Sequence, residues 1–108
     1  MASVELNGAL MRDEASFHAQ CKRVFGFPDS YPGTMDAFVD CLSYLRDDDA
    51  MCKFRLGPDE VLEIVVTDAQ AMLELGGDLL PEMTYCIGGI NDRYQDYGEK
   101  PALSLVLR

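Results

Sequence analysis

Three short apolar segments, far apart in the chain, constrain the fold more than any other feature. They lie at residues 3–7, 61–66 and 102–107, and the middle one, VLEIVV, is nearly continuous and rich in β-branched residues. Such segments are typical of buried strands. Because long connections with helical periodicity separate them, the strands are expected to pair in parallel. The sequence therefore predicts an α/β fold with a small, mostly parallel sheet.

Apolar residues at helical spacing predict four helices between these strands. The helices are expected over residues 14–25, 34–45, 69–75 and 80–97. Asp13 and Thr34 are the expected N-caps of the first two. Residues 51–56 form a further apolar stretch that either pairs with 61–66 as a hairpin strand or stays outside the sheet. The fold prediction is thus an α/β layer structure with a possible extra strand near 51–56.

The length and composition of the chain predict one soluble domain spanning residues 1–108. No stretch approaches 18 consecutive apolar residues, so no transmembrane helix is expected. The N-terminus lacks the basic start and apolar stretch of a secretory signal, which places the protein in the cytoplasm.

The chain is strongly acidic, with 19 acidic and 9 basic residues and a net charge of −10. This balance argues against nucleic acid or an anionic membrane as a direct partner, and it suits a basic protein partner. The four cysteines are widely spaced and there is a single histidine, so neither a zinc site nor another cofactor is expected. Cys21 and Cys41 fall on apolar helical stripes and are interpreted as core thiols in a reducing compartment.

Residues that would support catalysis are scarce. His18 is the only imidazole and lies in an amphipathic helix, where a structural role is favoured. The glycine pairs at 76–77 and 88–89 lack the pattern of a phosphate-binding loop. The sequence therefore predicts that the protein is not an enzyme.

Two carboxylates, Asp36 and Asp40, lie one helical turn apart on the face opposite the expected core stripe of the helix at 34–45. No lysine or arginine stands three or four residues from either one, and a like-charged pair at this spacing costs an isolated helix roughly 0.2–0.5 kcal/mol. Val39 and Ser43 share this face. It is either an ordinary solvated face or a surface that binds a cationic partner.

Several motifs follow one another in a specific order. They are VELNG at 4–8, Phe17-His18, Phe27-Pro28, MDAFVDCL at 35–42 and ALSLVL at 102–107. In this order and spacing the chain resembles the barstar family, the small intracellular inhibitors of secreted ribonucleases. The resemblance implies a small three-layer-type domain with a three-stranded parallel sheet and flanking helices, with residues 46–60 as an insertion.

The resemblance also implies a binding site. Asp36 and Asp40 match the two inhibitory aspartates of the family, and Asp40 matches the principal active-site ligand. Val39 stands where the family has a tryptophan, and Ser30 where it has a tyrosine. An acidic contact on the last helix matches Asp96, although Gln95 aligns equally well. The expected partner-binding residues are Ser30, Tyr31, Asp36, Val39, Asp40, Ser43, Tyr44 and Asp96.

The sequence thus favours an immunity-type inhibitor that blocks a basic ribonuclease or toxin with carboxylates that mimic RNA phosphates. We expect it to be a monomer when free. The alternative is an acidic interaction or regulatory module that has the same fold and a partner other than a nuclease.

Overall fold

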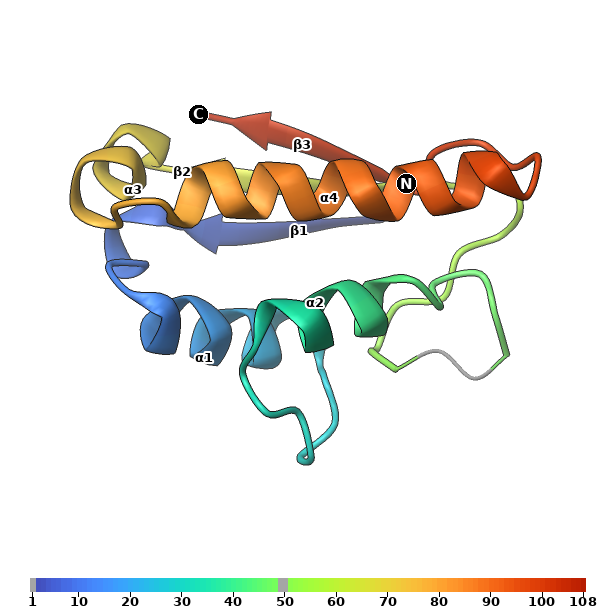
Figure 1. Ribbon diagram of the computed structural model, residues 1–108, viewed down its shortest axis with the longest axis horizontal. Coiled ribbons are helices and arrows are strands. Elements are labelled where there is room, and N and C mark those ends of the chain that lie inside the picture. Colours follow the sequence, from blue (N-terminus) through green and yellow to red (C-terminus); the bar gives the residue numbers. More distant parts are fainter. Residues whose placement is uncertain (1, 49–50) are drawn as a thin grey trace.

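The sheet has three parallel strands, β1 (Ala2–Asn7), β2 (Leu62–Thr67) and β3 (Leu103–Leu107), in the order β1-β2-β3 (Figure 1). The structure is a computed structural model that describes residues 2–48 and 51–108. This sheet confirms the α/β fold and the three-stranded parallel arrangement implied by the family resemblance.

Helices fill the two connections between the strands. They are η1 (Gly8–Leu10), α1 (Glu14–Phe25), α2 (Met35–Leu42), α3 (Ala69–Leu75) and α4 (Leu79–Asp96). α1 contacts β1, and α4 contacts both β3 and α2 (Figure 1). The long helix α4 therefore links the sheet to the helix that carries Asp36 and Asp40.

The strands alternate between a core face and an outer face, as expected for a pleated sheet. In β2, Leu62, Ile64 and Val66 are fully buried among the core residues. In register beside them, Val4 and Leu6 of β1 are buried in the same core. One face of the sheet thus supplies the apolar layer against which the helices pack.

Four phenylalanine rings join α2 to α1. Phe38 of α2 is fully buried, with its ring centroid 5.5 Å from that of Phe17 and 6.2 Å from that of Phe25. Phe27, in the loop after α1, stacks on Phe25 at 5.3 Å. Because Phe38 points into this cluster, the opposite face of α2 is turned towards solvent.

The end of α2 and the segment at 51–56 differ from simple expectation. The prediction that the helix reaches Leu45 is wrong, because the Ser43 N–H donates to the carbonyl of Asp40, three residues back, and α2 ends at Leu42. Residues 51–56 form no strand. Two of their N–H groups donate to carbonyls outside the sheet, Lys53 N to Phe25 O at 2.9 Å and Leu56 N to Leu45 O at 2.7 Å. Of the two alternatives for residues 51–56, the structure shows the one in which this segment stays outside the sheet, and only β2 after it is a strand.

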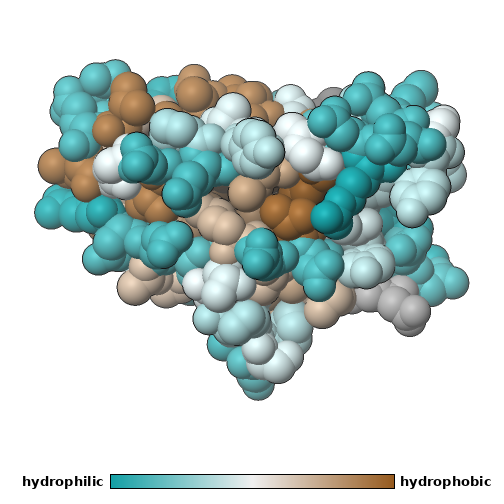
Figure 2. All heavy atoms as spheres, in the orientation of Figure 1, coloured by the Kyte–Doolittle hydropathy of each residue, from teal (hydrophilic) through white to brown (hydrophobic). Residues whose placement is uncertain are grey.

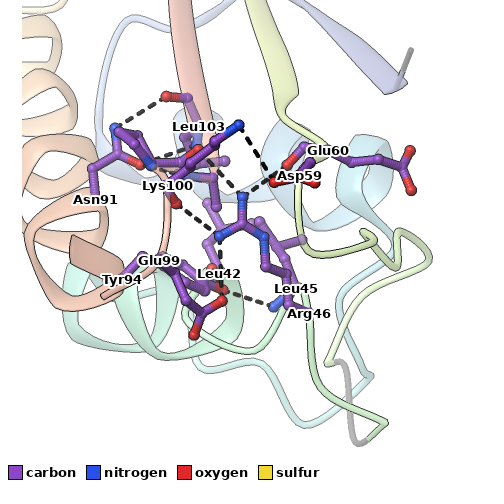
Figure 3. Close-up of polar contacts among 12 residues, drawn as sticks. Leu42, Leu45, Arg46, Asp59, Glu60, Asn91, Tyr94, Glu99, Lys100 and Leu103 are labelled. Atoms are coloured by element: carbon purple, nitrogen blue, oxygen red, sulfur yellow. Dashed lines mark hydrogen bonds and ion pairs between the residues drawn. The ribbon is translucent and has the colours of Figure 1, made fainter. Parts of the chain in front are cut away.

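The side chain of Arg46 connects the irregular segment after α2 to Glu60 and to residues 99–100, which precede β3 (Figure 3). It is 6% exposed and its guanidinium donates to the carbonyls of Lys100 at 2.7 Å and Glu60 at 2.9 Å. It also pairs with the Glu99 carboxylate at 3.3 Å and lies over the Tyr94 ring at 5.1 Å. A single buried cation thus connects three separate segments.

Loss of this cation is predicted to destabilise the fold. Arg46→Ala should lower the free energy of unfolding by about 3 kcal/mol, because several hydrogen bonds of a buried charge disappear together. Arg55→Ala is the matched control: its guanidinium pairs with Asp48, but the side chain is 64% exposed. That variant should lose less than about 1 kcal/mol. Urea denaturation measures both, and equal losses would contradict the structural role of Arg46.

Candidate functional site

The two predicted site carboxylates lie on α2, which begins at a capped N-terminus. Thr34 is the N-cap, and its side-chain oxygen accepts a hydrogen bond from the Ala37 N–H at 3.2 Å. Asp36 lies in the first turn, where the helix dipole favours an anion. Since Phe38 faces the core, Asp36 and Asp40 are both exposed.

No ion pair joins Asp36 or Asp40 to a base within residues 2–48 and 51–108. The carboxylates that do form ion pairs there are those of Asp48, Asp59 and Glu99. The acids of α2 are therefore available to a partner.

A groove with a cavity volume of about 690 Å³ lies between α2 and α4. Its lining comes from both helices: Met35, Asp36, Val39, Asp40, Tyr85, Cys86, Gly88, Gly89, Asp92 and Arg93. In the space-filling view, a hydrophobic area is visible between the two helices and hydrophilic side chains border it (Figure 2). The exposed face of α2 is thus one wall of a two-sided site.

The α4 wall contains residues that the sequence reasoning missed. Tyr85 is 83% exposed, and Asp92, two turns later, adds a third carboxylate to the groove. The available signal was periodicity, because the buried side of α4 is the stripe Met83, Ile87 and Ile90, and Asp92 falls opposite this stripe. The pattern alone could not show that this opposite side faces α2.

Arg93 is the basic residue of this lining, and its guanidinium is directed at the end of α2. Its Nη1 donates to the Ser43 hydroxyl at 3.3 Å, and that hydroxyl donates to the Val39 carbonyl at 2.6 Å. Ser43 therefore connects the two walls of the groove. Ser43 and Tyr44 also line an adjoining hollow of about 360 Å³.

The other expected site residues lie outside the groove. Ser30 is exposed in the loop before α2. Asp96 and Gln95 are exposed at the last turn of α4, and neither lines the groove. Asp92, not Asp96, is the acid of α4 that the fold brings to Asp36 and Asp40.

Tyr31 is a buried residue of the loop before α2. It is 9% exposed, and its hydroxyl lies 2.7 Å from His18 Nδ1. The same hydroxyl donates to the carbonyl of the N-cap Thr34 at 3.5 Å. Tyr31 therefore anchors the loop before α2 to α1, and its side chain is buried.

Burial has a clear effect on His18. It lowers the pKa of the imidazole, and the nearby negative charge of Glu14 opposes this only in part. The Nε2 atom is buried with no hydrogen-bond partner among the described residues. His18 thus acts as a neutral, buried support for the Tyr31 hydroxyl.

In residues 2–48 and 51–108 no three or more His, Cys, Asp or Glu side chains are grouped so that they could hold a metal ion. None of the helices described there combines the length and the apolar character needed to span a bilayer. The chemistry that the groove does offer is that its exposed carboxylates can accept charge-assisted hydrogen bonds from a cationic partner.

Comparison with known proteins identifies one family. The family model for Barstar, described as barnase inhibitor, matches residues 1–106, nearly the whole chain. No curated protein matches the chain. The family match confirms the resemblance carried by the motifs at 4–8, 35–42 and 102–107.

The buried imidazole predicts a specific pH dependence of stability. The unfolded chain protonates His18 near pH 6.5, whereas the folded chain does so only at lower pH. Below about pH 6.5 the unfolded state therefore binds the extra proton, and the free energy of unfolding falls as the pH falls. In urea titrations between about pH 7.5 and about pH 5.5, His18→Gln should show a shallower decline than wild type. Parallel curves would contradict a lowered pKa at His18.

Proposed function

Because this chain belongs to the barstar family, we propose that it is an immunity-type inhibitor of a ribonuclease. The observation that carries the proposal is the exposed pair Asp36 and Asp40. Neither carboxylate forms an ion pair within residues 2–48 and 51–108, and the opposite face of their helix packs into the core. The partner we propose is a basic ribonuclease or toxin protein.

The proposed mechanism is mimicry of RNA phosphates. A ribonuclease binds phosphates with basic side chains, and a carboxylate can accept charge-assisted hydrogen bonds from the same groups. Residues four apart on a helix have Cβ atoms roughly 5–6 Å apart, so Asp36 and Asp40 can engage neighbouring cations at once. We propose that Asp40 enters the centre of the active site and that Asp36 binds beside it.

The neighbouring residues have supporting roles in this proposal. Val39 is half-buried between the two acids and supplies apolar contact. Ser43 and Tyr44 extend the surface at the end of α2. Ser30 and Asp96, both exposed and away from the groove, are proposed as rim contacts.

The net charge of the chain supports a basic partner, and its free thiols support a reducing compartment. A net charge of −10 accelerates encounter with a basic enzyme. All four cysteines are free, and burial raises the pKa of the Cys21 thiol. Free thiols fit a reducing compartment, and we propose that the protein acts in the cytoplasm as a monomer until it binds its target.

Removal of the central carboxylate tests the mechanism. Asp40→Ala should weaken inhibition by roughly 2–5 kcal/mol, because truncation leaves a cation of the enzyme buried and unpaired. Asp40→Asn should behave similarly, since it keeps the shape and removes the charge. Asp48→Ala, at an exposed acid outside the groove, should leave the inhibition constant nearly unchanged.

The measurement is titration of a panel of barnase-type ribonucleases, barnase included, with each variant. Equal inhibition by wild type, Asp40→Ala and Asp48→Ala would refute phosphate mimicry. If no ribonuclease of the panel is inhibited by wild type, the interaction module with a non-nuclease partner becomes the better reading.

A second test uses salt. Because the attraction joins an acidic inhibitor to a basic enzyme, the association rate should fall steeply as ionic strength rises from about 0.01 M to about 0.5 M. Stopped-flow measurements at several salt concentrations give this slope. A rate independent of salt would show that charge does not guide the encounter.

A further inference from the structure

Two glycines in the middle of α4 have no structural explanation in the fold. Gly88 and Gly89 lie inside a continuous 18-residue helix, and neither has a positive φ. Apart from the neighbouring residues and the backbone of the same helical turns, a Cβ atom built on either one would meet no atom within 4 Å. At Gly8, by contrast, a Cβ would come within 2.6 Å of backbone oxygens, so the fold itself requires that glycine.

Glycine inside a helix is unfavourable compared with alanine. α4 neither breaks nor changes to another helix type at this pair. The lost stability therefore calls for an explanation outside the folded chain. The place of the pair gives one, because both glycines line the groove opposite Asp36 and Asp40.

We infer that Gly88 and Gly89 keep the groove open so that a basic segment of the ribonuclease lies directly against the α4 backbone. This inference rests on the proposed function and adds the middle of α4 to the binding surface, beyond the rim contact proposed at Asp96. Where side chains are missing, another chain can approach the helix closely, as small residues allow in other close contacts.

The rest of the α4 wall fits the same occupant. Asp92 lies one turn beyond the glycines, and with Asp36 and Asp40 it brings the acids of the groove lining to three, against one base, Arg93. A cationic segment is the complement of that charge. Tyr85, one turn before the glycines, is the exposed aromatic side chain in the groove lining. Aromatic residues of this kind frequently dominate binding energy.

The test separates folding from binding. In the double variant Gly88→Ala, Gly89→Ala, the melting temperature should rise, because alanine favours the helix and the added methyl groups meet no neighbour. Its dissociation constant for the ribonuclease of the panel that wild type inhibits most strongly should nevertheless increase tenfold or more. Gly89→Leu should weaken binding further, and Tyr85→Ala should also weaken it at least tenfold.

Ala19→Leu serves as the control, because it places a leucine at an exposed helix position outside the groove. Its dissociation constant should equal that of wild type. If the glycine variants bind as tightly as wild type while Asp40→Ala binds weakly, the inference about α4 is overturned and the proposed function stands. If Asp40→Ala also binds as wild type does, or no ribonuclease binds, the proposed function fails and this inference fails with it.

Discussion

The packing of Phe38 against the aromatic rings of α1 determines how the site is presented. A helix of eight residues is too short to be stable in isolation, so α2 depends on this contact for both its existence and its orientation. Phe38 is fully buried between Phe17 and Phe25, and it sets the rotation of the helix about its axis. With that rotation fixed, Asp36 and Asp40 can only point outwards. The exposure of like charges follows from the core.

α4 combines two roles on opposite sides of one helix. Its buried stripe, which includes Ile87 and Ile90, packs in the core, and the helix contacts both β3 and α2. Its other side forms the second wall of the groove. Because one rigid element touches both the sheet and α2, the distance across the groove is set by core packing and not by mobile loops. A partner therefore meets a preformed surface, which reduces the entropy lost on binding.

The polar groups of the molecule divide into a structural set and a binding set. Arg46 and His18 are buried and have defined partners within the fold, and the loop before α2 is held through the Tyr31 hydroxyl. Asp36 and Asp40 are exposed and form no ion pair with the described residues. Interactions that fix the backbone thus lie away from the carboxylates that are proposed to bind. This division allows substitutions at the site to change binding with little effect on stability.

Local patterns in the sequence determined the strands, the start of each early helix and the exposed pair Asp36 and Asp40. They did so because capping chemistry and the periodicity of apolar residues act over a few neighbouring positions. Only the tertiary structure decided that Tyr31 is buried against His18 and that residues 51–56 form no strand. Only the tertiary structure, likewise, brought Tyr85 and Asp92 to the acids of α2. These outcomes depend on contacts between separate segments of the chain, which periodicity along one helix cannot encode. The sequence defined the faces of the helices, and packing against the shared sheet determined which faces meet.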